Sequence, residues 1–205
     1  PALVAAGEHA HAPAGQATRL RAIGQAAGAY IVAEAPGRIV LVEQQAAHER
    51  VLYERLAAQR AAGALERTLL DAPLSVELAE TLHEAILGQR DALGALGFEL
   101  EEFGAALHIR TLPAGFAPQR LAGTLTELAQ HIIQYGAASQ EWHDEALIVL
   151  AHHMAAAPGT VFTYTQMQSL LDDLARCARP ETCPRGRPTL LMLDAAYLAQ
   201  QFGRE

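Results

Sequence analysis

The sequence predicts an α+β fold with two subdomains, and three observations support this. Two β-branched runs, residues 30–34 and 38–42, lie near the start, an alternating pair lies in the middle, and a further apolar run, residues 189–193, lies near the end. Segments with helical spacing of apolar residues separate these runs. A length of 205 residues, 51% of them apolar, suffices for one domain or two small subdomains with a buried core.

Composition narrows the functional class. Fifteen Lys plus Arg stand against 23 Asp plus Glu, a formal charge of −8, which excludes a protein whose main surface grips a phosphate backbone. Two cysteines, Cys177 and Cys183, are too few for a disulfide scaffold and indicate a reduced, intracellular protein. No apolar stretch approaches the roughly 20 residues that span a bilayer. The start lacks both an initiator Met and a signal-peptide pattern, so we expect a fragment of a longer protein.

The first elements follow a linker. Residues 1–20, rich in Ala, Gly and Pro, predict a flexible linker in which His9 and His11 are solvated, with weak metal binding as the alternative. Folding patterns begin near Ile23. Residues 30–34 and 38–42 flank an Ala-Pro-Gly turn and predict a hairpin whose second strand is buried on both faces. Residues 46–60 lack Gly and Pro and predict a helix.

The middle of the chain repeats this alternation of helix and strand. Residues 69–78 contain Pro73 and predict an edge strand or an irregular connection. Residues 78–96 keep helical spacing and predict one amphipathic helix, weakened toward its end by glycines. Residues 98–111 alternate on either side of Gly104 and predict a half-exposed hairpin, and residues 118–135 predict a further helix.

The last third predicts two helices, a strand and a final helix. Ser139 is the expected N-cap of a central helix that runs to about residue 157. Thr165 and Gln168 have the spacing of a capping box for the next helix. Residues 189–193 predict a buried strand, and Asp194 is the expected cap of a last helix. In the helix after Thr165, we expect Met167, Leu170, Leu171 and Leu174 to form a buried stripe. In the last helix, we expect Leu198 and Phe202 to lie on the same face. Because the middle block separates two similar strand-and-helix units, we interpret it as an insertion.

Three polar segments could carry chemistry. Residues 43–54 place polar side chains where a strand enters a helix, His152 and His153 lie within an apolar helix, and residues 183–189 form a Pro- and Gly-containing turn with one thiol and two guanidiniums. Taken singly, these segments are typical of a solvated first helical turn, core histidines and a turn with a surface cysteine. Two thiols six residues apart exclude a four-cysteine zinc site.

Together the segments resemble the C-terminal domain of bacterial MutL mismatch-repair proteins. Glu-Gln-Gln-Ala-Ala-His-Glu-Arg-Val-Leu-Tyr-Glu at 43–54 resembles the family motif Asp-Gln-His-Ala-x-x-Glu-x-x-x-x-Glu. Ala-His-His at 151–153 resembles an Ala-Cys-Lys-type helix, and Cys-Pro-Arg-Gly-Arg-Pro-Thr at 183–189 resembles Cys-Pro-His-Gly-Arg-Pro-Thr. Gly24-Gln25 with residues 30–34 resembles the preceding strand, so order and spacing agree over about residues 24–205.

The resemblance implies an architecture and a set of partners. It implies a dimerisation subdomain made of residues 21–66 and 137–205, and an inserted external, regulatory subdomain made of residues 67–136. The implied partners are a second copy of the chain, MutS and the sliding clamp, with DNA held mainly by the full-length protein and no membrane involved. ATP is implied to bind elsewhere in the parent protein, because this chain has no Gly-rich phosphate loop. The implied location is cytoplasmic, associated with the nucleoid.

Many MutL C-terminal domains nick DNA with a metal centre, and this chain departs from their motif at several positions. Gln45 and Arg185 stand where the family has histidines, and His152 stands where it has a cysteine. Glu43 replaces an aspartate, while Glu49 and Cys183 are retained. The resemblance therefore implies four candidate ligands for Zn or Mn: Glu43, Glu49, His152 and Cys183. It also implies that Gln44, Glu54 and Arg187 line the motif.

These departures favour a degenerate site. Glu49, His152 and Cys183 could hold one zinc ion, but a second metal would need the lost imidazoles. Arg185 would repel each unit charge on a metal by about 4 kcal/mol at about 4 Å and an effective dielectric constant near 20. We therefore expect a homodimerisation and partner-assembly domain in which Gln45 and Arg185 argue against endonuclease activity. The alternatives are a nicking endonuclease with a modified ligand set, and a generic α+β interaction module.

A clamp-binding segment is also implied by the resemblance. MutL domains often contact the clamp through a Gln-x-Leu-Leu-x-Pro-like segment, and the corresponding residues 67–73 keep Leu69, Leu70 and Pro73 but lack the Gln. An apolar edge strand is the alternative interpretation.

Overall fold

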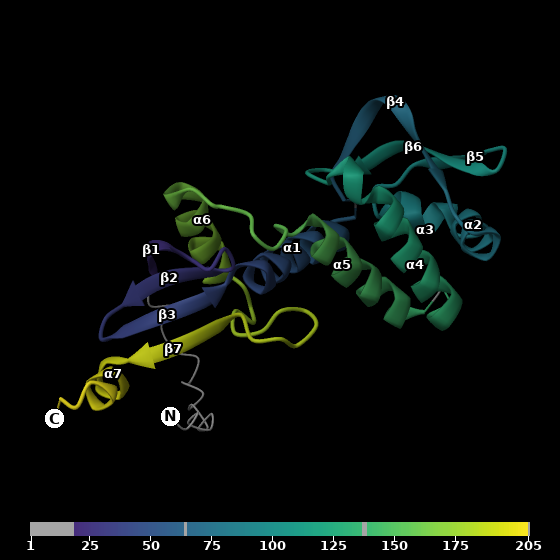
Figure 1. The fold of residues 1–205 in the computed structure, drawn as a ribbon. Coiled ribbons are helices and arrows are strands. Elements are labelled where there is room, and N and C mark those ends of the chain that lie inside the picture. Colours follow the sequence, from purple (N-terminus) through teal and green to yellow (C-terminus); the bar gives the residue numbers. More distant parts are fainter. Residues whose placement is uncertain (1–18, 64, 137–138, 205) are drawn as a thin grey trace.

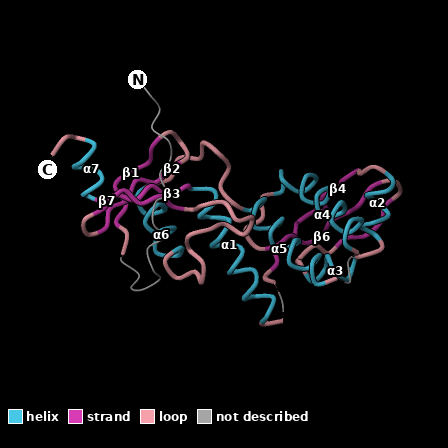
Figure 2. The backbone as a smooth tube through the Cα atoms, turned by 90° about the horizontal axis from the view of Figure 1, so that it is seen from below, coloured by secondary structure: helices cyan, strands magenta, loops and turns pink. Residues whose placement is uncertain are grey.

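The computed structural model of the protein describes residues 19–63, 65–136 and 139–204. Two sheets lie at opposite ends of an elongated molecule, with helices between them (Figure 1), and a view at right angles keeps these ends apart (Figure 2). The predicted α+β class is confirmed. His9 and His11 of the predicted linker lie outside the described residues. None of the described helices combines the length and apolar character needed to cross a membrane.

Both ends of the chain form the first sheet. It is antiparallel, with the order β1 (Arg21–Ala26), β2 (Tyr30–Ala35), β3 (Arg38–Glu43) and β7 (Leu190–Asp194). The predicted hairpin is therefore confirmed as β2 and β3. The sequence pattern does not predict β1, because a bulge between Ala22 and Gly24 breaks its alternation.

Helices cover one face of the first sheet, whereas among the described residues no helix buries side chains against the other face, which we call the open face. The buried residues of α1 (Gln44–Ala61) and α6 (Tyr164–Leu174) pack on the covered face with those of the sheet. Two predictions of burial are wrong here. In β3 buried residues alternate with half-buried ones, and β7 lies at the sheet edge with Leu191 and Met192 45% and 39% exposed. A strand is buried on both faces only where both faces are covered.

The middle of the chain forms the second sheet, with the order β4 (Arg67–Glu77), β6 (Ala106–Pro113) and β5 (Leu100–Phe103). The predicted edge strand is confirmed as β4, and its pairing is irregular between Leu69 and Leu74, around Pro73. The predicted hairpin around Gly104 is confirmed as β5 and β6.

Three helices of the middle block pack with the second sheet. The single predicted helix at residues 78–96 is two helices, α2 (Glu80–Leu87) and α3 (Arg90–Ala95), because the first ends at Gly88. A short 3-10 turn, Pro118–Arg120, leads into α4 (Leu121–Tyr135). The helix predicted at residues 118–135 is thereby confirmed.

The central helix α5 (Gln140–Met154) links the two halves. The backbone N–H of Trp142 donates to the Ser139 hydroxyl at 3.0 Å, which confirms the predicted N-cap. α5 packs between α1 and α4. The larger core therefore includes Leu56 of α1 and Leu147 of α5 beside residues of the second sheet. The subdomain boundaries at 66/67 and 136/137 stay a prediction.

Two predicted caps near the end have different outcomes. The capping box of α6 is made by Thr163 and Gln166, two residues before the predicted pair. Gln168 instead donates to the Leu20 carbonyl and accepts from the Ala22 N–H, so it ties α6 to β1. The predicted stripe on α6 is buried. Asp194 caps α7 (Ala195–Gln201) as predicted, but Phe202 lies beyond that helix and is 78% exposed.

Candidate functional site

The site begins where β3 enters α1. Glu43 is the N-cap of α1: its carboxylate accepts from the backbone N–H groups of Gln45 at 3.3 Å and Ala46 at 2.5 Å. A carboxylate here pairs donors that have no partner within the helix and complements the helix dipole. The side chain of Glu43 thus has a structural task at the helix start.

Gln44 faces a different part of the molecule. Its Oε1 accepts from Nε2 of Gln25 at 2.8 Å, and its own Nε2 donates to the carbonyl of Thr160 at 3.0 Å. Gln25 also donates to Thr160 and accepts from the N–H of Phe162. Since Gln44 is 2% exposed, these bonds satisfy a buried amide and hold the connection between α5 and α6.

Glu49 is the centre of the site. Its side chain is 2% exposed, and its Oε1 lies 2.8 Å from Nδ1 of His152 and accepts from Nε2 of Gln45 at 3.1 Å. Nη2 of Arg187 lies 3.0 Å from Oε1 and 2.9 Å from Oε2. Helix α1, helix α5 and the segment before β7 therefore meet at one buried carboxylate.

The charge on Glu49 is favoured by its partners. Burial alone would raise the pKa of Glu49, but hydrogen bonds from His152 and Arg187 outweigh it and hold that pKa below its ordinary value. Hydrogen bonds first to Cys183 and then to Glu49 raise the pKa of Arg187. Glu49 is thus an ionised group paired with a guanidinium, a strong class of hydrogen bond.

The turn of residues 183–187 supplies that guanidinium. The N–H of Cys183 donates to the carbonyl of Arg187 at 2.8 Å, and the N–H of Gly186 donates to the carbonyl of Cys183 at 2.9 Å. Gly186 adopts φ +81°, which favours glycine. Cys183 is 1% exposed, so the interpretation of this segment as a turn with a surface cysteine is wrong. Both cysteines are free thiols.

Glu54 serves the same segment from further along α1. Its carboxylate accepts from the N–H groups of Ala178 at 2.7 Å and Arg179 at 3.3 Å, while Nε of Arg50 donates to the carbonyl of Thr182 at 2.6 Å. Burial first, and then the charge of Glu54, raise the pKa of Cys177 to about 11. Glu54 therefore anchors the chain after α6.

Arg185 reaches across to α4. Its Nη2 donates to Oε1 of Glu127 at 2.7 Å, and Nε2 of His153 lies 2.9 Å from Oε2 of Glu127. Burial alone would raise the pKa of Glu127, but hydrogen bonds from Arg185 and His153 hold it below the ordinary value. Burial lowers the pKa of His153. Sequence reasoning missed Glu127 because it lies outside all three motifs.

Comparison with known proteins identifies the family. The profile described as "MutL C terminal dimerisation domain" matches residues 23–161. The chain belongs to this family. It is 36% identical over 186 residues to the DNA mismatch repair protein MutL of Acidiphilium cryptum, covering 89% of this chain and 32% of the relative. For the MutL of Bradyrhizobium sp. (strain BTAi1) the identity is 35%, covering 85% and 29%, and for that of Rhizorhabdus wittichii it is 33%, covering 100% and 36%. The chain spans about a third of the length of these relatives.

The MutL motif residues in this chain do not fit a metal ion as they are arranged. Within the described ranges, no group of three or more His, Cys, Asp or Glu side chains is placed to hold one. The structure brings Glu49 and His152 together, but Arg187 contacts both carboxylate oxygens and Glu43 caps α1. The donors that a metal would use are already bound to protein groups, so we derive no metal-dependent step.

The residues expected to bind the clamp lie on β4, at the edge of the second sheet. Leu69 is 73% exposed and Pro73 is exposed as well, while Leu70 packs against the larger core. The expectation of clamp binding stays a prediction for this MutL family member.

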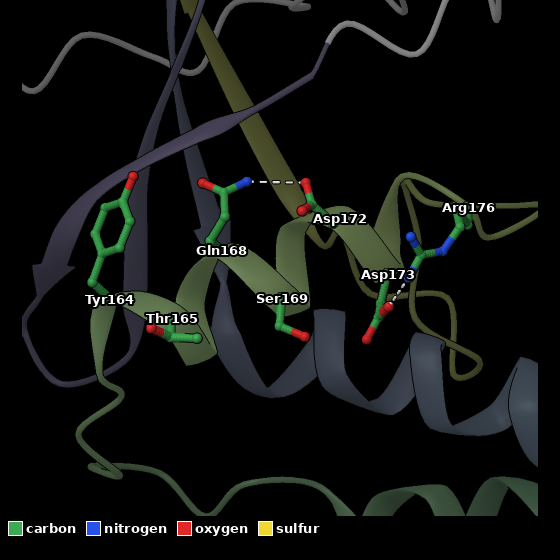
Figure 3. A pocket seen from close by; sticks show the side chains of 7 residues that line it. All are labelled: Tyr164, Thr165, Gln168, Ser169, Asp172, Asp173 and Arg176. Carbon is green, nitrogen blue, oxygen red and sulfur yellow. Dashed lines mark hydrogen bonds and ion pairs between the residues drawn. The ribbon is translucent and has the colours of Figure 1, made fainter.

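A shallow polar pocket is lined by side chains of α6 and by Arg176 just after it (Figure 3), and it contains none of the motif residues. Gln168 donates to Asp172 at 3.0 Å, and Arg176 pairs with Asp173. Both acidic side chains of this pocket are thus paired with neighbours on α6 or just after it.

Proposed function

We propose that this chain is the homodimerisation and partner-assembly domain of a MutL-type mismatch repair protein, and that its metal and endonuclease site is degenerate. The observation that carries the first half is the open face of the first sheet. Val32, Leu41 and Leu191 are directly opposite one another on β2, β3 and β7, and Ile39 faces Leu193 in the next row.

This row pattern leaves apolar side chains on the side away from α6. The alternate rows, which contain Ala33 and Val40, belong to the buried core, so Leu41 and Leu191 point to the other face. Contiguous exposed apolar surface marks an interaction site. A second copy of this face is the occupant that we propose, because the family is described as a dimerisation domain.

Sedimentation of the 205-residue chain at micromolar concentration tests this half of the proposal. We expect twice the mass of the 21.9 kDa chain. A monomer under these conditions would overturn it.

The contacts of Glu49 support the second half. Gln45 and Arg185 stand where the MutL motif has histidines, so two imidazole ligands are missing. Arg187 binds the buried carboxylate of Glu49. Two-metal cleavage of a phosphodiester needs two cations close together, which the two guanidiniums oppose. The alternative is a nicking endonuclease with a modified ligand set that uses zinc or manganese, favoured by the 2.8 Å approach of His152 to Glu49.

Nicking of supercoiled plasmid with manganese distinguishes these two functions. The chain is compared with Glu49→Lys, and the metal content of both is measured after purification. We expect equal, background cleavage and no bound zinc. Cleavage that is lost in Glu49→Lys would overturn the degenerate site and support the nickase.

The partners of the assembly belong to the same proposal. We propose that this domain binds MutS and the sliding clamp, and that Leu69, Leu70 and Pro73 at the β4 edge contact the clamp. We also propose that the rest of the parent protein holds most of the DNA, and that the protein is cytoplasmic. The exposure of β4 supports the clamp contact. A clamp pull-down that is unchanged by Leu69→Ala with Pro73→Ala would remove the clamp contact.

A further inference from the structure

Two side-chain triads of the same composition lie around the turn of residues 183–187. The first triad consists of Arg187, Glu49 and His152, and the second of Arg185, Glu127 and His153. In each, a carboxylate is contacted by a guanidinium and an imidazole: on Glu127 they occupy different oxygens, whereas Arg187 contacts both oxygens of Glu49 and His152 contacts Oε1. Glu49 belongs to α1 and Glu127 to α4, so each triad ties the turn to a different helix.

The triads are joined at both ends. Arg185 and Arg187 are two residues apart on a turn closed by hydrogen bonds between Cys183, Gly186 and Arg187. His152 and His153 are neighbours on α5, and their ring centroids lie 5.4 Å apart at an angle of 77°. The two triads, the turn and the adjacent histidines of α5 therefore connect the turn, α1, α5 and α4 in one continuous set of contacts, which we call the ring.

This ring crosses between the two halves of the molecule. Figure 1 shows the yellow loop before β7 extending from the first sheet toward the central helices. Glu54 and Arg50 fix that loop to α1. Arg185 carries the connection on to α4, whose buried residues belong to the core of the second sheet.

The second triad is less exposed than the surface ion pair between Arg110 and Glu101, whose side chains are 52% and 46% exposed. The Glu127 side chain is 26% exposed, that of His153 15% and that of Arg185 40%. Exposed ion pairs contribute little to stability, whereas partly desolvated pairs with several hydrogen bonds contribute more. Both Glu127 oxygens are occupied, one by each partner.

We propose that Arg185 and Arg187 act in this chain as a metal-independent clasp, in which the turn of residues 183–187 fastens α4 of the inserted half to α1 and the first sheet. The inference rests on the proposed degenerate site, since a guanidinium supplies the charge that a cation would supply there. It assigns a structural role to Glu127 and to Arg185, which stands where the MutL motif has histidine.

A double-mutant cycle on the 205-residue chain tests the clasp. Arg185→Ala and Glu127→Gln are each expected to lower the thermal midpoint by about 2–4 °C, and the double variant by no more than about the larger of the two. The matched control is Arg110→Ala with Glu101→Gln, a 2.7 Å ion pair on the second sheet whose side chains are 52% and 46% exposed, with effects below about 1 °C. Amide exchange should quicken at residues 181–189 in Arg185→Ala and stay unchanged in the control.

Two outcomes would overturn the clasp in different ways. Additive effects of Arg185→Ala and Glu127→Gln, or effects no larger than the control, would remove the clasp and leave the degenerate site standing. A fall in the midpoint of the wild-type chain on adding EDTA would show that a metal holds the site, and both proposals would fail. Dimer mass is measured separately by sedimentation and should be the same in all variants.

Discussion

Side chains at the motif positions mostly bind backbone groups or one another. Glu43 caps α1, Glu54 holds the N–H groups after α6, and Gln44 holds the carbonyl of Thr160. The sequence indicates that Glu49 and His152 belong to one site, because both fall in its motifs, and the structure places them 2.8 Å apart. It could not indicate Glu127, whose place depends on how α4 packs against α5.

Breaking the first triad should change stability in a pH-dependent way. Because the pKa of Glu49 is lowered by folding, its contribution is present above the ordinary pKa of 4.5 and is lost as the pH falls through the folded value. Because the Arg187 side chain is 51% exposed and stays solvated, Glu49→Gln should cost about 2 kcal/mol at pH 7, the worth of hydrogen bonds to a charged group, and give a shallower loss of stability in acid. Urea unfolding between pH 3 and 8 measures this.

The control for that series is Glu34→Gln. Glu34 pairs with Arg21 at the surface, with side chains 46% and 61% exposed, so its loss should have little effect. If the free energy of unfolding falls equally steeply with decreasing pH in the wild type and in Glu49→Gln, the assignment of a buried, charged Glu49 is contradicted.

The thiol of Cys177 should react slowly. Its pKa is raised from 9.0 to about 11, first by burial, so at pH 8 the thiolate fraction is about a hundredfold below that of an ordinary thiol. Alkylation by iodoacetamide, followed at each cysteine by mass spectrometry from pH 7 to 10, should still be rising at pH 10. The urea-unfolded chain provides the reference, and a midpoint near 9 in the folded chain would be inconsistent with this pKa.

The sequence predicts whole helices and strands where the spacing of apolar residues determines them. The helices α1 and α4 and the stripe of α6 follow from the helical spacing of apolar residues, and α5 from its N-cap Ser139 and the apolar run of residues 146–151. The sequence does not predict features that depend on single hydrogen bonds or on whether another layer covers a strand. Examples are the bulge in β1, the end of α2 at Gly88 and the exposure of β7. A pattern cannot specify whether a second layer covers a strand.

The capping box offers a test at this scale. Thr163 and Gln166 satisfy each other's backbone N–H groups at the start of α6, while Thr165 lies outside the box. Thr163→Ala should cost about 1 kcal/mol, which corresponds to a fall of about 2–4 °C in the thermal midpoint. Thr165→Ala, in the same turn, is the matched control and should change little. A larger effect at Thr165 would favour the cap predicted from sequence.

At the scale of the whole molecule, acidity and apolar content have separate explanations. A chain with a formal charge of −8 is poorly suited to hold DNA by itself, in agreement with a family described by its dimerisation. The apolar half of its composition supplies two cores and an open sheet face. The sequence predicts strands near both ends of the chain. It does not determine the register of β3 and β7, which places Leu41 beside Leu191 and is visible only in the structure.

That register leads to a prediction about assembly. Leu191 is 45% exposed in the single chain, so Leu191→Glu should fold normally, as circular dichroism would show. In a dimer through the open face, however, the new carboxylate would be buried without a partner, which costs several kcal/mol. We expect the dimer to weaken by about a hundredfold or more in sedimentation equilibrium.

Leu69→Glu is the matched control for this experiment. Leu69 is 73% exposed on the edge strand of the second sheet, so the same substitution there adds the same charge at the other end of the molecule. It should leave the dimer intact. If both variants, or neither, weaken the dimer, the open face of the first sheet is not the interface. Weakening by Leu191→Glu alone would assign self-association to the sheet that the two ends of the chain build together.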